Sequence, residues 1–416
     1  MSSSTTSSAP APVSLRQDAG VIGLVGIAHL ISHYSQLLLA PLFPFLKEEF
    51  AVSYAELGFL MTIFFVVSCG VQAWSGFVVD RFGARPILFG GLALLGCAAL
   101  GFAASTSYMM LAMFSVVAGI GNGVFHPVDY TLLNRKVSGP RLGHAYSVHG
   151  ITGSLGWALA PAMLVPLAIA FSWRVALVCA AVLAFVVLAV LLVWRDKLAL
   201  PPAAKPSASA VAEDGGRFGF LAIPSVWMCF AFFFIYASAL SVVQTFAPSA
   251  AGQLHAVPTA LVAMCLTIYM VSSSGGMVLG GFLASNPERC EKVVGVGFAI
   301  AAAVALVLGF ANIPGTLVPV LFGVMGFGAG IAGPSRDLLV KRSTPANATG
   351  RVYGVVYSGL DIGQAITPLL FGWMMDHGQF RNVWLGLALL QGLLIASAFN
   401  VQRVRRTPVA AAGAAA

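Results

Sequence analysis

Five ionisable side chains that lie within long apolar stretches are the best candidates for chemistry in this chain. His29 and His33 are four residues apart, so on a helix they share one face. His126, Arg336 and Asp361 lie in three later apolar stretches. Histidine changes its charge near neutral pH, and a charge in the middle of a membrane helix costs about 2.5–3.5 kcal/mol on insertion scales. We therefore expect these residues to bind a solute or to carry a proton.

Other interpretations of these residues stay open. The spacing of His29 and His33 would suit two metal ligands, but no third ligand is evident from the sequence. We therefore expect no metal and no cofactor. Alternatively, the two histidines bond to neighbouring helices without a further role, and Asp361 braces or caps a helix.

The composition indicates a protein that lies almost wholly within a lipid bilayer. Of its 416 residues, 59% are apolar and only 9% are charged, with a mean hydropathy of +0.91, whereas soluble proteins carry roughly 25% charged residues. Helices of ~20 residues span a bilayer, and twelve apolar runs are long enough. They cover 19–43, 55–79, 86–104, 107–133, 144–170, 174–194, 221–248, 257–284, 292–311, 315–340, 351–375 and 383–402. The expected fold class is an all-α integral membrane protein with twelve transmembrane helices.

The basic residues predict the orientation of these helices. They gather after every second run, as with Arg81 and Arg85 after the second and Lys341 and Arg342 after the tenth. Because positive residues accumulate in cytoplasmic loops, both termini should be cytoplasmic, with the chain in the cell (inner) membrane. The net charge of +8 follows from this bias and does not indicate nucleic-acid binding.

The chain contains an internal repeat. Residues 119–174 and 326–381 share a pattern at a constant offset of 207, and matched Gly and Pro residues imply matched backbone shapes. In this pattern Gly119, Gly121, Gly123, Pro127, Gly156 and Pro161 fall on Gly326, Gly328, Gly330, Pro334, Gly363 and Pro368. The repeat predicts two pseudo-symmetric six-helix bundles with a binding site between them.

We divide the chain accordingly. Residues 1–18 form a disordered cytoplasmic tail, 19–197 the first bundle, 198–217 a cytoplasmic linker rich in Pro, Ala and Ser, 218–406 the second bundle and 407–416 a disordered tail.

A loop after the second run carries a family signature. Gly76, Asp80, Arg81, Gly83 and Arg85 form the pattern G-x-x-x-D-R-x-G-x-R. With twelve spans in two similar halves, this resembles the major facilitator superfamily. The resemblance implies a conformational latch at the cytoplasmic side, built from this loop, and a central cavity lined by the first, fourth, seventh and tenth spans.

Asp129, three residues after His126, falls near the cytoplasmic end of its helix. We expect it to pair with Arg85 of the loop as a cytoplasmic gate. Arg336 occupies the matching position in the second half and is expected to pair with a carboxylate there or to bind an anionic solute.

The stretch Gly123-Val124-Phe125-His126-Pro127 is similar to the fosmidomycin-resistance-like drug exporters. Gly156-Trp157-Ala158-Leu159-Ala160-Pro161 resembles the antiporter signature G-x-x-x-G-P only in part, because Ala160 replaces a glycine. The resemblance implies a monomeric secondary active transporter, proton-coupled and exporting drug-like compounds. The alternative is proton-coupled uptake of a small organic anion.

Other classes of function find little support in the sequence. The phosphate-loop pattern GxxxxGK[ST] does not occur, nor do HExxH and GxSxG, so neither ATP-driven transport nor a membrane enzyme is indicated. A transporter-like receptor that binds without flux remains a third hypothesis.

Overall fold

A computed structural model describes residues 14–200, 224–283, 290–343 and 349–406. Most of the expected linker, the expected C-terminal tail and residues 1–13 lie outside these residues, whereas residues 15–18, expected as part of the disordered N-terminal tail, form the first turn of α1. The described helices are α1 (Leu15–Gln36), α2 (Phe43–Phe50), α3 (Tyr54–Phe82), α4 (Ala84–Ala104), α5 (Tyr108–Asn122), α6 (Phe125–Lys136), α7 (Leu142–Ala170), α8 (Trp173–Val193), α9 (Pro224–Thr245), α10 (Ala247–His255), α11 (Thr259–Leu283), α12 (Cys290–Phe310), α13 (Val318–Ser343), α14 (Thr349–Asp376) and α15 (Phe380–Arg406).

Local sequence signals explain where several helices begin and end. Ser14 and Ser53 start α1 and α3 through capping boxes, in which the serine side chain accepts a hydrogen bond from the third helical N–H. Gly83, with a φ of +86°, separates α3 from α4, a conformation that favours glycine. The loop glycine of the signature therefore has a structural role in the turn.

Eleven helical segments in the described part of the chain are long and apolar enough to cross a membrane. They correspond to all the predicted spans except the eleventh. That position is occupied by α14, a helix of 28 residues. The fold is therefore the expected helical membrane protein with two halves, α1–α8 and α9–α15.

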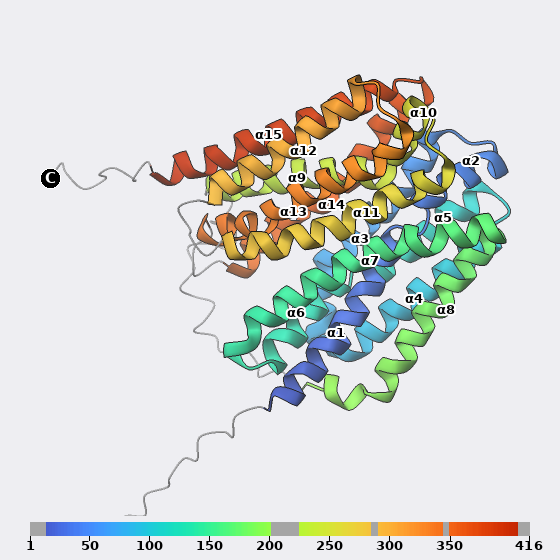
Figure 1. The fold of residues 1–416 in the computed structure, drawn as a ribbon. Coiled ribbons are helices and arrows are strands. Elements are labelled where there is room, and N and C mark those ends of the chain that lie inside the picture. The colour runs from blue at the N-terminus through green and yellow to red at the C-terminus, as the bar shows by residue number, and fades with distance from the viewer. Residues whose placement is uncertain (1–13, 201–223, 284–289, 344–348, 407–416) are drawn as a thin grey trace, which may run out of the picture.

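The two halves repeat one another in detail. Each begins with a long helix followed by a short one, α2 or α10, and the short helices end at Ala51 and Ala256, both left-handed with φ of 51° and 48°. In Figure 1, α2 and α10 lie at one end of the molecule, away from the ends of the described chain. The matched left-handed residues show that even the turns of the first half recur in the second.

The repeated glycines mark the places where helices approach most closely. A Cβ on Gly119 of α5 would lie 2.6 Å from the carbonyl oxygen of Phe64 on α3, and one on Gly123, directly after α5, would lie 2.5 Å from that of Ser68. The matching Gly326 and Gly330 of α13 lie against Tyr269 and Ser273 of α11 in the same way. Small residues at such crossings allow backbone contact in a membrane.

Two further glycine pairs complete the correspondence between the halves. Gly121 contacts Gly91 on α4, whereas Gly328 contacts Gly297 on α12. Gly156 lies against Leu30 on α1, whereas Gly363 lies against Phe234 on α9. The prediction of two similar bundles is confirmed, since matched glycines meet matched helices.

The prolines of the repeat act differently in the two halves. Pro127 has no N–H to offer the carbonyl of Gly123, and the fourth span breaks there into α5 and α6. The freed carbonyl accepts a hydrogen bond from Ser75 at 3.3 Å. Pro334, in contrast, lies inside the continuous helix α13. Only the first half has the expected interruption at this position.

The halves contact each other mainly through α3 with α14 and α7 with α11. Asp376 of α14 accepts hydrogen bonds from the backbone N–H groups of Tyr54 and Ala55, at 2.7 and 2.9 Å, and so caps a helix of the other half. Thr62 donates to the carbonyl of Ala365 at 2.5 Å. These contacts join the two halves at the end where α3 begins.

Candidate functional site

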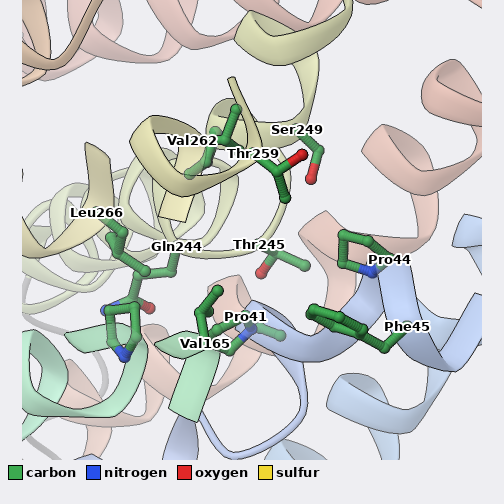
Figure 2. Close-up of a pocket in the computed structure, with 13 residues that line it drawn as sticks. Pro41, Pro44, Phe45, Val165, Gln244, Thr245, Ser249, Thr259, Val262 and Leu266 are labelled. Carbon is green, nitrogen blue, oxygen red and sulfur yellow. The ribbon is translucent and has the colours of Figure 1, made fainter. Parts of the chain in front are cut away.

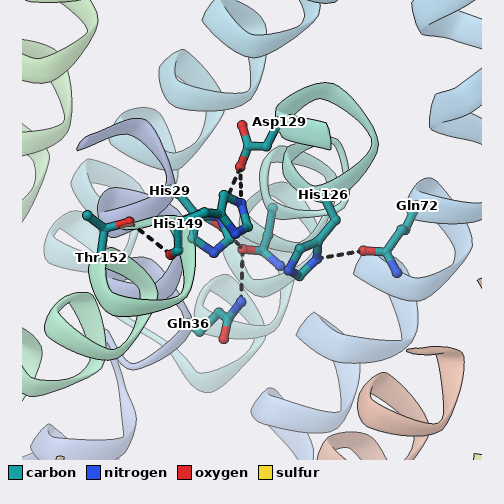
Figure 3. Close-up of polar contacts among 9 residues, drawn as sticks. His29, Gln36, Gln72, His126, Asp129, His149 and Thr152 are labelled. Carbon is teal, nitrogen blue, oxygen red and sulfur yellow. Dashed lines mark hydrogen bonds and ion pairs between the residues drawn. The ribbon is translucent and has the colours of Figure 1, made fainter. Parts of the chain in front are cut away.

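A cluster of four histidines and one aspartate lies inside the first bundle. Figure 3 shows His29, His126 and His149 of this cluster with Asp129. Helix α1 supplies His29 and His33, α6 supplies His126 and Asp129, and α7 supplies His149. The ring centroids of His29 and His33 are 4.3 Å apart, and those of His29 and His149 are stacked at 3.5 Å. The predicted face shared by His29 and His33 is present, and His126 joins it from α6, with ring centroids 5.4 and 6.1 Å from theirs.

Asp129 is fully buried and bonds to two histidines of the cluster. Its side chain is 0% exposed, and Oδ2 lies 2.9 Å from Nδ1 of His29 and 3.1 Å from Nε2 of His149. An ionised carboxylate only accepts hydrogen bonds, so with Asp129 ionised both ring nitrogens carry a proton. The expected pairing of Asp129 with Arg85 is wrong in this conformation. Arg85 instead donates to the carbonyl of Arg195 at 3.4 Å.

The reason for this difference is the break in the fourth span. Residues Gly123 and Val124 separate α5 from α6, so Asp129 lies in the second turn of a new helix. Its carboxylate thereby points toward α1 and α7 (Figure 3). A charge so deep needs partners, and the two histidines supply them.

An amide network lies beside the histidines. Asn122, at the end of α5, accepts a hydrogen bond from Ser32 at 2.8 Å and donates to Ser68 at 2.9 Å. Trp157 donates its indole N–H to Gln36 at 2.9 Å, and its ring lies 4.2 Å from that of His33. Polar groups from α1, α3, α5 and α7 thus converge on one buried region.

Gln72 of α3 connects the cluster with the second half of the protein. Its Oε1 lies 3.0 Å from Nδ1 of His126, and its Nε2 donates to Oδ2 of Asp361 on α14 at 3.2 Å. The carboxylate accepts, so the amide N–H₂ must face Asp361 and the amide oxygen must face His126. A continuous path of hydrogen-bonding groups therefore crosses from the histidines to Asp361.

Several residues of this site were not among the expected candidates. His149 and Gln72 lie on the fifth and second spans, which the resemblance did not place at the central cavity. His149 carried a signal, since it is an ionisable residue in an apolar run. The side chains of Asp80 and Arg336 and the surroundings of Gly76 lie outside the described part of the structure, so the expected roles of these residues stay predictions. The same holds for the latch role of Arg81 and Arg85.

A separate pocket of about 50 Å³ lies between the halves at the end where α2 and α10 sit (Figure 2). Pro41, Phe45 and Pro161 line it from the first half, with Gln244 and Leu266 from the second. Gln244 accepts a hydrogen bond from Gln364 at 3.0 Å. The pocket holds about one or two water molecules and shares no residue with the histidine cluster.

Two like helical bundles that meet along α3–α14 and α7–α11, with polar groups buried beside this contact, define a membrane transporter rather than an enzyme. The family model of the Major Facilitator Superfamily matches residues 25–318 and 259–415, and the chain belongs to this superfamily. It is a multi-pass membrane protein of a family whose members bind small-molecule substrates within the membrane.

Curated relatives differ in what their names say they handle. The chain is 25% identical over 386 residues to the fosmidomycin resistance protein of Escherichia coli (strain K12), covering 89% of each chain. It is 22% identical to the hexuronate transporter of Bacillus subtilis (strain 168), covering 90% of this chain and 93% of that one.

The fold has also been seen in crystals. A bacterial homologue of the human lysosomal transporter Spinster, in an inward-facing and occupied conformation, superposes with a TM-score of 0.74 at 14% identity, covering 94% of this chain and 98% of the other. At this identity the likeness concerns the fold alone.

Proposed function

We propose that this protein is a proton-coupled secondary transporter that exports small drug-like solutes by alternating access. The observation that carries the proposal is the contact of Gln72 with both His126 and Asp361, because it joins a buried polar cluster of one half to a carboxylate of the other. Because this hydrogen bond crosses the boundary between the halves, it can form or break as the halves move to open one side of the membrane or the other.

Asp361 is the residue to which we assign the proton. It lies on α14, the helix that packs against α3 of the other half. Protonation of Asp361 removes the negative charge to which Gln72 now donates a hydrogen bond. This hydrogen bond between the halves then weakens, and the halves can separate. Release of the proton on the other side restores the bond and closes the cycle.

The histidine cluster and its amide neighbours provide the solute-facing polar groups. They present ring nitrogens and amide groups beside the aromatic ring of Trp157. This mixture suits an amphipathic molecule that has one hydrogen-bonding end. The similarity to the fosmidomycin resistance protein favours export of such compounds.

The second candidate is proton-coupled uptake of a small organic anion. It is favoured by the similarity to the hexuronate transporter and by a probable sulfoacetate transporter of Cupriavidus necator, 22% identical over 86% of this chain. Imidazole N–H groups could donate to a carboxylate or sulfonate.

Transport in proteoliposomes tests both candidates. A panel of drug-like compounds and organic anions is offered with and without an imposed pH gradient, on the wild type and on Asp361→Asn. Gradient-driven movement of a drug-like compound in the export direction supports the proposal. Movement of anions alone in the opposite direction supports the alternative, and flux that ignores the gradient contradicts proton coupling in both.

A further inference from the structure

The arrangement of three ring nitrogens in the cluster resembles a metal site. One nitrogen from each of His29, His33 and His126 lies within 4.8 Å of one from each of the others. Three points so spaced lie within about 2.8 Å of a common centre, whereas zinc–nitrogen bonds are about 2.0–2.1 Å. Movements of less than about 1 Å for each ring would bring all three into coordination distance.

Two of the histidines are oriented in the way that metal-bound histidines usually are. Nδ1 of His29 donates to Asp129 at 2.9 Å, and Nδ1 of His126 donates to Gln72 at 3.0 Å. Each contact places the proton on Nδ1 and leaves the lone pair of Nε2 free. Carboxylate or amide acceptors behind a ligating imidazole fix its tautomer and raise its basicity.

His33 supplies the independent observation that a ligand belongs here. It is only 8% exposed, and although it lies beside the backbone of Gly153, neither of its ring nitrogens makes a hydrogen bond of normal geometry to a described residue. Buried polar groups are seldom left unsatisfied. A Cβ on Gly153 would lie 2.8 Å from Nδ1 of His33 and 3.1 Å from Nε2 of His29, so the glycine keeps the space beside both nitrogens open.

We propose that His29, His33 and His126 bind one divalent transition-metal ion of the zinc, nickel or cobalt type. Imidazole nitrogen suits these borderline ions, whereas calcium and magnesium require oxygen ligands. The buried charge of Asp129 offsets part of the positive charge of the ion. Three protein ligands leave a fourth position for water or another small donor.

A second group, His29, Asp129 and His149, has the same spacing but is less suitable. Its donor atoms already bond to one another at 2.9 and 3.1 Å through Oδ2 of Asp129. We therefore place Asp129 behind the ligands and not among them. The proposal concerns binding alone and does not rest on the proposed transport function.

The test uses the full chain, purified in detergent without a polyhistidine tag and stripped of metal. Cobalt(II) is titrated while the visible absorption typical of four-coordinate cobalt is recorded, and zinc is then added to displace it. One equivalent of cobalt should bind, and zinc should displace it. His33→Ala and His126→Ala should each weaken binding at least tenfold, and Asp129→Asn about 10–100-fold through its effect on His29.

His377→Ala is the matched control, since His377 is exposed and bonds only locally, to the carbonyl of Trp373. It should bind cobalt as the wild type does. Thermal unfolding identifies any variant that has lost its fold, and His33→Gln then replaces His33→Ala. Wild-type binding no tighter than that of a folded His33 variant would overturn the proposal and leave an ordered water as the partner of His33.

Discussion

The side-chain amide of Gln72 lies between the two halves of the protein, with its nitrogen 3.2 Å from the Oδ2 of Asp361. The same side chain accepts a hydrogen bond from His126 at 3.0 Å. The amide of glutamine carries an acceptor oxygen and a donor nitrogen without a charge, so it can bond to both partners at once. The contact therefore joins a buried cluster of the first half to the carboxylate that we assign to proton coupling.

Gln72→Met keeps the length of the side chain and removes both hydrogen bonds. Each partner left without a bond in a buried site costs about 1–3 kcal/mol. We expect solute flux to fall about tenfold or more, while the protein still inserts and folds. Gln253→Met, on the exposed surface of α10, is the control. Equal flux in the wild type and in Gln72→Met would mean that the two hydrogen bonds of Gln72 have no part in the transport mechanism.

Asp129 should be energetically coupled to His149 and not to Arg85. The carboxylate lies 3.1 Å from His149, whereas Arg85 bonds to the backbone of Arg195. In a double-mutant cycle on unfolding, Asp129→Asn with His149→Ala should show a coupling of about 0.5–3 kcal/mol. Asp129→Asn with Arg85→Ala should be additive within about 0.5 kcal/mol. Coupling of Asp129 to Arg85 without coupling to His149 would instead support the pairing of Asp129 with Arg85 that the sequence predicts.

Asp376 should stabilise the state in which the two halves are joined at the end where α3 begins. Its carboxylate accepts from Tyr54 and Ala55, across the boundary between the halves. Hydrogen bonds to a charged group contribute about 1.5–3 kcal/mol, so Asp376→Ala should shift the population toward opening at this end. Reaction of Thr62→Cys with an impermeant maleimide, in a chain without its native cysteines, should become faster.

Glu49→Ala is the control for this measurement. Glu49 pairs with Arg174 at 2.9 Å within the first half, and both side chains are well exposed. Loss of this pair should leave the labelling rate unchanged. Labelling that is equally fast in both variants would mean that the effect of Asp376 is not specific to the contact between the halves.

The glycines of the repeat should not tolerate a side chain. A Cβ on Gly123 would lie 2.5 Å from the carbonyl oxygen of Ser68, and overpacking of this kind costs about 1–3 kcal/mol. We expect Gly123→Ala to lower the unfolding temperature by several degrees. Gly90→Ala, where nothing lies within 4 Å, should instead be neutral or stabilising, because alanine favours a helix by about 1 kcal/mol. Similar values for the two variants would contradict the close crossing.

Much of the architecture could be predicted from the sequence, because bilayer thickness and backbone sterics act locally. Apolar runs of ~20 residues define the helices, and the matched Gly and Pro residues predicted the matched backbone shapes of the two halves. The pairing of His29 with His33 followed from a spacing of four residues alone.

The partners of the histidines could not be predicted in this way. His149 and Gln72 reach the site from α7 and α3 through tertiary packing, which no spacing within one helix encodes. The break at Gly123 turns Asp129 toward α1 and α7, so Arg85 is not its partner in this structure. The repeat added no help here, since Gly333 and Val356 occupy the matching positions of His126 and His149.

The most direct test of proton coupling is solute flux in proteoliposomes, measured for the wild type and Asp361→Asn with and without a pH gradient. Asp196→Asn, on the exposed surface after α8, is the control. We expect the gradient to accelerate flux in the wild type and the control. Asp361→Asn should still exchange solute across the membrane but should not respond to the gradient. A full response to the gradient in Asp361→Asn would contradict the assignment of the proton to this carboxylate.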